Sequence, residues 1–204
     1  MELGIDILAM LFAAAFIAAF IDAIAGGGGL ITIPALLMTG MPPAMALGTN
    51  KLQAFGGALS ASIYFLRKRA VNLSEFSFIL LVIFIGSVIG TLLIQNLDAS
   101  LIKKGLPFLI LAIGLYFLFT PKLGESDRKQ RISYGVFALC FGSLLGFYDG
   151  FFGPGVGSLM NLACVTLLGF NLTKATAHAK VMNLTSNFAS LIFFFIGGLS
   201  LIHI

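Results

Sequence analysis

Long apolar runs dominate this chain and limit it to a fold that lipid can surround. Residues 5–24, 76–94 and 106–119 are almost uninterrupted apolar stretches. They approach or reach the roughly 20 residues with which an α-helix crosses the hydrocarbon core of a bilayer. Charged residues make up only 10% of the 204 positions, against about 25% in a soluble domain. The sequence therefore predicts an all-α, polytopic membrane protein embedded in a lipid bilayer.

The few charges and the two cysteines exclude several other classes. The net charge of +4 does not indicate nucleic-acid binding, because the basic residues lie mainly in short loops between apolar runs. The start carries Glu2 and Asp6 instead of basic residues, so it does not resemble a cleavable signal peptide. Cys140 and Cys164 lie in apolar segments without CxxC spacing. We expect two buried thiols, no disulfide, no metal and no cofactor.

The stretch 22–53 breaks the apolar pattern. The first long run is followed by four successive glycines, Gly26, Gly27, Gly28 and Gly29. Glycine helps to end a helix and lets other groups approach the backbone closely. The next apolar piece, 30–39, has ten residues, too few for a straight helix to span at about 1.5 Å per residue. We expect a half-helix or one arm of a re-entrant hairpin there, then a turn at 40–43 and a helix that begins with Pro43.

Two ordinary spans and a hydrophilic loop complete the first half. Ser74 and Glu75 favour the start of a helix that ends near Gln95, because a hydroxyl and a carboxylate stabilise a helix N-terminus. A second span, 101–119, returns across the membrane. The clearly hydrophilic loop after it separates a first membrane repeat from a second, which divides the chain into residues 1–120, 121–131 and 132–204.

The pattern of the stretch 22–53 returns after the loop. A phenylalanine, an aspartate and two glycines recur at an offset of 127 residues, which aligns Phe20, Asp22, Gly26 and Gly28 with Phe147, Asp149, Gly153 and Gly155. A glycine, an alanine and a lysine then recur at an offset of 129 residues, two more than before. This aligns Gly40, Ala46 and Lys51 with Gly169, Ala175 and Lys180. We interpret the chain as two tandem helical repeats, each with a glycine-broken short helix and an intramembrane lysine.

The number of segments predicts how the two repeats are oriented. If the piece 30–39 counts as a segment, five segments precede the loop, so the second repeat begins on the opposite side and the repeats are inverted. If the piece 30–39 folds back without crossing, the repeats are inverted only when the corresponding short piece of the second repeat also fails to cross. The basic clusters 67–69 and 122–131 then share one side, which the positive-inside rule makes cytoplasmic. We expect the N-terminus outside, in a bacterial inner membrane, and an incomplete second repeat because the chain stops six residues after Gly198.

Two motifs carry a resemblance to a known family. The segment FIDAIAGGGGLITIPALLMTGMPPAMALGTNKLQA and the segment GFYDGFFGPGVGSLMNLA, which is followed by LLGFNLTKATAHAKVMNLTSN, resemble the paired signatures of the TauE/SafE family. The whole chain is similar to the YfcA-like branch of that family. The resemblance implies a multi-pass exporter of small sulfur-containing anions such as sulfite or organosulfonates. It also implies a further pair of helices, with which members of the family usually continue.

The residues also indicate an anion site without the resemblance. Broken helices leave unpaired backbone N–H groups and the positive end of a helix dipole at membrane depth, where irregular backbone must be buried or line a cavity. A lysine there costs at least ~2.5 kcal/mol, so it faces the protein interior. We expect Lys51 and Lys180 to hold a small anion, with Asp22 and Asp149 gating or tuning them. The other substrate-binding candidates are Gly26, Gly27, Gly28, Gly29, Asn50, Gln53, Gly153, Gly155, Gly157 and Asn183.

Alternative roles remain open for these residues. The glycines also suit close helix packing, and the lysines also suit ion pairs with Asp22 or Asp149 that only hold helices together. His178 lies about 200° around its helix from Lys180. It is either a hydrogen-bonding packing residue, which we favour, or a proton carrier for coupling. The alternative functions are an intramembrane aspartyl protease that uses the two aspartates and a structural subunit, whereas the broken GxGxxG spacing excludes nucleotide binding.

Overall fold

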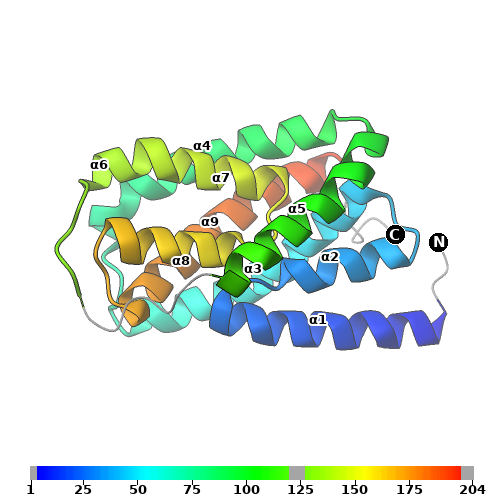
Figure 1. The fold of residues 1–204 in the computed structure, drawn as a ribbon, viewed down its shortest axis with the longest axis horizontal. Helices are drawn as coiled ribbons and strands as arrows, with labels where there is room; N and C mark the ends of the chain where they lie inside the picture. Colours follow the sequence, from blue (N-terminus) through cyan, green and yellow to red (C-terminus); the bar gives the residue numbers. More distant parts are fainter. Residues whose placement is uncertain (1–3, 120–126, 199–204) are drawn as a thin grey trace.

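A computed structural model describes the protein at residues 4–119 and 127–198, and within these residues all regular structure is helical (Figure 1). This result confirms the predicted all-α class. In chain order the elements are α1 (Ile5–Ala25), α2 (Gly29–Met38), α3 (Pro43–Arg67), α4 (Leu73–Gln95), α5 (Ala99–Phe119), α6 (Tyr134–Val136), η1 (Phe137–Gly142), α7 (Ser143–Phe151), α8 (Val156–Leu167) and α9 (Leu172–Ile196).

α1 and α2 form a hairpin around the first glycine break. α1 ends at Gly26, which has a φ of 80° and donates its N–H to the Asp22 carbonyl oxygen at 2.9 Å. α2 has ten residues, about 15 Å of helix, so it is too short to cross a bilayer. In Figure 1, α2 returns toward the end of the molecule at which α1 begins. The predicted short helix is therefore present as the returning arm of a hairpin.

α3 and α4 are the long helices that follow. α3 begins at Pro43, as predicted, since proline at the first helical position loses no hydrogen bond. The N-cap of α4 is Asn72, whose side-chain oxygen accepts the N–H of Ser74 at 3.2 Å. The expectation that Ser74 caps this helix is wrong, because the Asn72 amide oxygen already satisfies that backbone donor. Glu75 lies in the first turn and α4 ends at Gln95, both as expected.

The second half has the same order of elements. α6, η1 and α7 form one continuous span, in which η1 is a π-helical stretch of six residues. A break at Gly153 and Gly155, with φ angles of 91° and 74°, leads to the twelve-residue α8. In Figure 1, α8 returns toward the end at which α6 begins. α9 follows Asn171, whose side chain accepts the N–H of Lys174 at 2.9 Å.

α4 and α7 approach each other through glycines. A Cβ atom on Gly86 would lie 2.7 Å from the carbonyl oxygen of Ser143, and one on Gly90 would also meet the backbone of α7. In the opposite direction, Gly146 and Gly150 of α7 face the backbone of α4. Small residues four positions apart let helices pack closely in a membrane, where apolar burial alone does not drive association. This interface fixes the position of α7, which carries Asp149.

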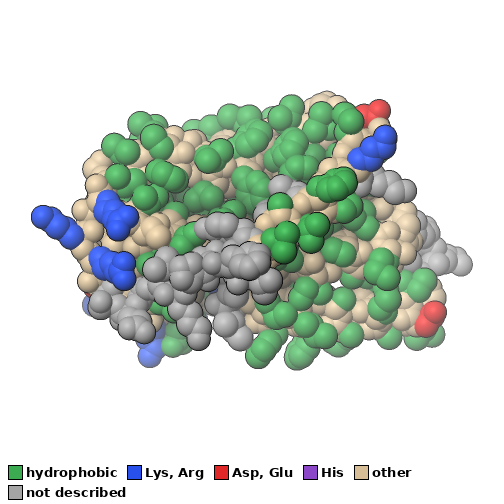
Figure 2. All heavy atoms as spheres, viewed as in Figure 1, with side chains coloured by type: hydrophobic (Ala, Val, Ile, Leu, Met, Phe, Trp, Pro, Cys, Tyr) green, Lys and Arg blue, Asp and Glu red, His purple; other side chains and the backbone are tan. Residues whose placement is uncertain are grey.

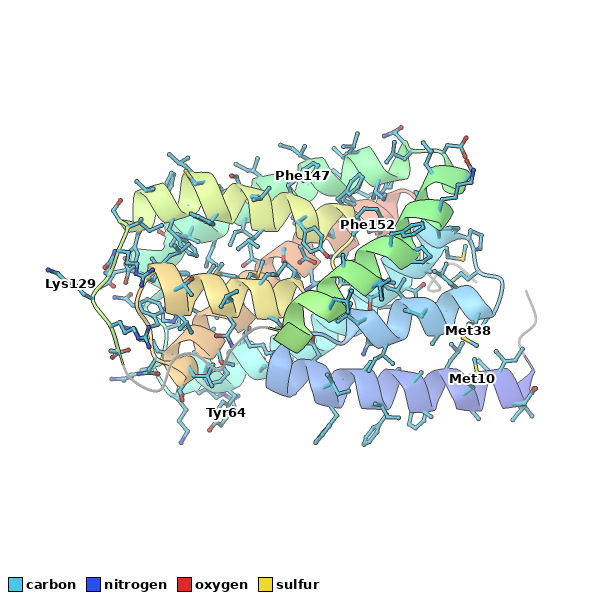
Figure 3. The ribbon with its side chains drawn as sticks, in the orientation of Figure 1. Met10, Met38, Tyr64, Lys129, Phe147 and Phe152 are labelled. Carbon is cyan, nitrogen blue, oxygen red and sulfur yellow. The ribbon has the colours of Figure 1, made fainter. Side chains whose placement is uncertain are left out.

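The outer surface of the bundle is apolar. Within the described residues, the segments that are long and apolar enough to cross a membrane include Ile5–Ala23, Leu73–Gln95, Tyr134–Phe151 and Leu172–Ile196. Figure 2 shows hydrophobic side chains along the length of the visible face, most of the visible Lys and Arg side chains at one end, and a further basic side chain near the opposite end. Figure 3 shows Lys129 pointing away from the bundle at the end with most of the basic side chains. The described residues therefore form a multi-pass helical membrane protein.

The two cysteines differ in their surroundings. Cys164 is buried, and its Sγ lies 4.0 Å from the Sδ of Met182. Cys140 is exposed on η1, so the expectation that both thiols are buried is wrong. Lipid tails are as apolar as the protein interior, so an apolar segment of a membrane protein can place a thiol on its outer face without cost.

Candidate functional site

The two glycine breaks touch each other inside the bundle. A Cβ atom on Gly26 would lie 2.7 Å from the carbonyl carbon of Gly157, and one on Gly157 would lie 3.0 Å from the Cα of Gly26. A Cβ atom on Gly29 would lie 3.4 Å from the Cα of Pro154. The distances at Gly26 and Gly157 leave too little room for a Cβ atom, whereas the distance at Gly29 is an ordinary contact, so Gly26 and Gly157 let one break pack directly against the other. The predicted break residues of both halves are therefore brought together.

Lys51 of α3 forms a fully buried ion pair with Asp149 of α7. Both side chains are 1% exposed. The Lys51 ammonium donates to the backbone carbonyl and to Oδ1 of Asp149, and the Ser186 hydroxyl of α9 donates to Oδ2. A Cβ atom on Gly153 would lie 2.7 Å from the Lys51 Nζ. The second glycine break therefore provides the space that this lysine fills.

Lys180 of α9 forms the second ion pair, with Asp22 of α1. The Lys180 ammonium donates to the backbone carbonyl of Asp22 and lies 3.4 Å from its Oδ2. The N–H of Gly28 donates to Oδ1 of the same carboxylate at 3.2 Å. The side chains of Lys180 and Asp22 are 7% and 19% exposed. This pair is thus less buried than that of Lys51, and its carboxylate also contacts the first glycine break.

The pairing is crossed between the halves of the chain. The lysine of the first half binds the aspartate of the second, and the lysine of the second half binds the aspartate of the first. Sequence analysis left ion pairs with Asp22 or Asp149 as an alternative role of the lysines, and it did not predict which aspartate each one takes. The formal charges of these four groups add to zero. A further anion at either lysine therefore competes with a carboxylate that is already bound.

Three predicted amide residues take different places around the breaks. Asn50 is 4% exposed, lies beside Gly29, and has a buried Oδ1 without a hydrogen-bond partner among the described residues. The Gln53 amide donates to the carbonyl of Ala15 at 3.3 Å and accepts the Thr32 hydroxyl at 3.1 Å. Asn183 is buried, and its backbone carbonyl accepts the Ser186 hydroxyl at 3.1 Å. Asn50 and Gln53 therefore adjoin the first break from α3.

A small hollow lies between Asp22 and α3. Its volume is about 10 Å³, which is room for about one water molecule. A ligand larger than water therefore requires these groups to move apart. The hollow is lined by Ala19, Asp22, Gly28, Gly29, Gln53, Ala54 and Gly57.

His178 lies apart from the lysine pairs. Its Nδ1 is 2.7 Å from the carbonyl oxygen of Lys174. Its ring packs against Phe76 and Phe170, with centroid distances of 4.6 and 4.7 Å. Lys180, two residues further along α9, is directed to Asp22 instead. The structure does not bring His178 together with the other predicted site residues.

A group of hydroxyl side chains behind Asp149 was missed by sequence analysis. Beyond the Ser186 hydroxyl, Ser87 donates to the Ser186 carbonyl at 2.7 Å and lies 2.8 Å from the Ser190 hydroxyl. Thr91 donates to Ser190 at 3.0 Å. A usable signal was the spacing of four that separates Ser87 from Thr91 and Ser186 from Ser190, because such residues share one helix face. Among the described residues no three His, Cys, Asp or Glu side chains form a metal-binding group.

Comparison with known proteins places the chain in a family. It matches the family described as "Sulfite exporter TauE/SafE" over residues 11–204. It is 74% identical to a "Probable membrane transporter protein" of Haemophilus influenzae, over 97% of this chain and 78% of the relative. It is 56% identical to the "Probable membrane transporter protein YfcA" of Escherichia coli strain K12, over 94% of this chain and 71% of the relative. No solved structure matches the chain.

The helical fold and the family match agree. Apolar helices, glycine breaks and buried lysines define a multi-pass membrane protein with a polar interior. The chain belongs to the TauE/SafE family of membrane transporters. The family resemblance of the two sequence motifs is thereby confirmed.

Proposed function

We propose that this protein is a permease or exporter of small anions of the sulfite or organosulfonate type, with its site between the two glycine breaks and the two lysines. The observation that carries the proposal is the crossed pairing of Lys51 with Asp149 and of Lys180 with Asp22. It places two cations from different halves of the chain beside two helix breaks. Each lysine costs at least ~2.5 kcal/mol in a bilayer, and a role in anion transport accounts for that cost.

The polarity of the breaks supports an anionic cargo. α2 begins at Gly29 and α8 begins at Val156, so the N-terminal ends of both short helices point into the bundle, where the breaks touch. Helix N-termini carry partial positive charge and free N–H groups that favour anions. The description of the family as a sulfite exporter agrees with this chemistry. The four charged groups already balance, so an anion that enters adds a net charge to the site. We therefore include in the proposal that transport is coupled to protons or to the membrane potential.

The arrangement of the helices supports inverted repeats. The α1–α2 hairpin opens toward one end of the molecule, and the hairpin of α7 and α8 opens toward the other (Figure 1). An exchange of the two halves also exchanges the two lysine–aspartate pairs, as a pseudo-two-fold axis in the membrane plane requires. With the basic residues 67–69 and 128–131 placed in the cytoplasm, the N-terminus lies outside a bacterial inner membrane.

Two other functions compete with transport. An intramembrane aspartyl protease needs two carboxylates that share a proton, whereas Asp22 and Asp149 each bind a lysine. A structural subunit would use the ion pairs only to hold helices together, and the complete pairing of both lysines is compatible with that role. Transport activity separates this last alternative from the proposal.

Sulfite flux in proteoliposomes tests the proposed function. In the Lys180→Ala variant we expect flux to fall by about 10- to 100-fold, because a charge-assisted hydrogen bond to the anion contributes about 1.5–3 kcal/mol. In the Lys51→Ala variant we expect flux to fall because the buried ion pair with Asp149 beside the second glycine break is lost. Lys174→Ala is the matched control, since Lys174 is an exposed lysine in the first turn of α9, and its flux should equal that of the wild type. Unchanged flux in both Lys51 and Lys180 variants would sink the anion-site proposal.

A further inference from the structure

The two lysine–aspartate pairs differ in a way that assigns them different roles. We propose that the Asp22 carboxylate is a tethered substitute for the transported anion, which occupies the anion's place on Lys180 until the ligand displaces it. Asp149 remains bound to Lys51 throughout and holds the helices together. This inference rests on the proposed function and names the group that the anion replaces.

The contacts of Asp22 describe the ligand that fits in its place. Its Oδ1 accepts the N–H of Gly28 at 3.2 Å, and its Oδ2 lies 3.4 Å from the Lys180 Nζ. Two oxygens on one central atom thus bridge the N-terminus of the ten-residue α2 and a buried ammonium. Sulfite, sulfonate and carboxylate groups present oxygens in the same way. The site therefore suits a small anion with at least two oxygens on one atom.

A second observation at the same helix end points to a ligand from outside the chain. Asn50 is 4% exposed and lies beside Gly29, and its Oδ1 has no hydrogen-bond partner among the described residues. A buried amide oxygen without a partner is unfavourable. The hollow beside Asp22 measures only about 10 Å³, so a ligand that reaches Asn50 needs Asp22 to withdraw. Because an amide oxygen only accepts, the Asn50 Oδ1 needs either an anion that also carries an O–H group, such as hydrogensulfite, or a water molecule that enters with the anion.

The surroundings of the two aspartates explain why only one of them is displaceable. Asp149 is 1% exposed, accepts the Ser186 hydroxyl and belongs to α7, which is packed against α4 through glycines. Asp22 is 19% exposed and belongs to α1, in which Ala18 is the one buried residue among positions 5–23. Segments with few buried contacts open at low cost. The helix that carries Asp22 is therefore the one that moves.

Charge balance determines what happens to the displaced carboxylate. Lys180 of α9 is the charged group that faces Asp22. Lys51 of α3 is directed to Asp149, and His178 of α9 is directed to Phe76. Neither α2 nor α8 contains an Asp, Glu, Lys, Arg or His. Among the described residues Asp22 thus has no second cation to pair with, so the anion and the carboxylate compete for Lys180 alone.

Methanesulfonate binding to the purified protein in detergent tests the inference. Methanesulfonate is a monoanion at neutral pH and presents several oxygens on one central atom, as the site requires. The Asp22→Asn variant should bind methanesulfonate about tenfold more tightly than the wild type at neutral pH, as expected if only about a tenth of the wild-type molecules have an open site. Asp98→Asn, which changes an exposed carboxylate on the α4–α5 turn, should behave as the wild type.

The possible results separate this inference from the proposed function. If wild-type protein binds methanesulfonate but Asp22→Asn binds it equally or less well, Asp22 is not a substitute for the anion, although transport stands. If neither protein binds methanesulfonate and the Lys180→Gln variant shows the same sulfite flux as the wild type, both proposals fail. An Asp22→Ser variant, compared by its unfolding temperature, excludes a folding defect of the asparagine variant, and it should also bind more tightly than the wild type.

Discussion

A leucine in place of Asp149 is expected to lower the free energy of unfolding by about 3–5 kcal/mol. The substitution leaves the Lys51 ammonium, 1% exposed, without its carboxylate. It also removes the carboxylate that accepts the Ser186 hydroxyl and leaves that hydroxyl only the Asn183 carbonyl. The loss is large because a buried charge without a partner keeps its full desolvation penalty. Equilibrium unfolding of the purified protein in detergent micelles, followed by circular dichroism, measures it.

Two further variants separate the effect of charge from that of shape. Lys51→Met combined with Asp149→Leu removes both charges, and this chain should recover most of the lost stability because no buried charge remains. Asp22→Leu breaks the more exposed pair, so it should cost less than Asp149→Leu. Equal stability of the Asp149→Leu chain and the wild type would contradict a structural role for this ion pair.

Gly150→Ala is expected to destabilise the protein by at least the upper part of the range of about 1–3 kcal/mol that overpacking costs. The new methyl group would collide with the Ser87 carbonyl oxygen of α4. Because the opposing atom belongs to the backbone, it cannot rotate away as a side chain would, and the two helices must separate. Thermal unfolding in detergent measures the loss.

The control for this substitution is a glycine without neighbours. Gly56 of α3 is exposed, and a Cβ atom there meets nothing within 4 Å. Gly56→Ala should leave stability unchanged or raise it by up to ~1 kcal/mol, since alanine is the better helix former. If Gly150→Ala proved as stable as Gly56→Ala, the close packing of α4 on α7 would be refuted.

The positions of the helices and of their breaks follow from local chemistry, so the sequence predicts them well. Apolar length defines the spans, Pro43 begins α3 where expected, and the glycines end α1. The short apolar piece after them forms α2, because nothing in it except Pro34, in the second turn, disturbs a helix. The cost of a lysine in a bilayer also predicts that Lys51 and Lys180 are buried. The structure confirms this prediction, because both side chains are buried.

The partners within the site depend on how distant segments pack, which local chemistry does not encode. Lys51 lies 98 residues from Asp149 in sequence, and Lys180 lies 158 residues from Asp22. The aspartate and the lysine of one repeat are closer in sequence than the residues that pair. In the fold, however, each lysine pairs with the aspartate of the other repeat. The hydroxyl of Ser186 was overlooked for a similar reason. Its role depends on its hydrogen bond to the Asp149 carboxylate of another helix, which the residues around Ser186 do not reveal. His178, by contrast, could be set apart from Lys180 by helical geometry alone.

Locating a bound anion tests the central claim most directly. In crystals grown with bromomethanesulfonate, anomalous scattering from bromine marks the position of the ligand. We predict a peak beside the first glycine break, with the sulfonate within hydrogen-bonding distance of the Lys180 ammonium and the Gly28 N–H, and no such peak in Lys180→Gln crystals. Bromine found only in the open cavity of about 520 Å³ beside Arg128, Lys129 and Arg131, with none between the breaks, would contradict an anion site shared by the two halves.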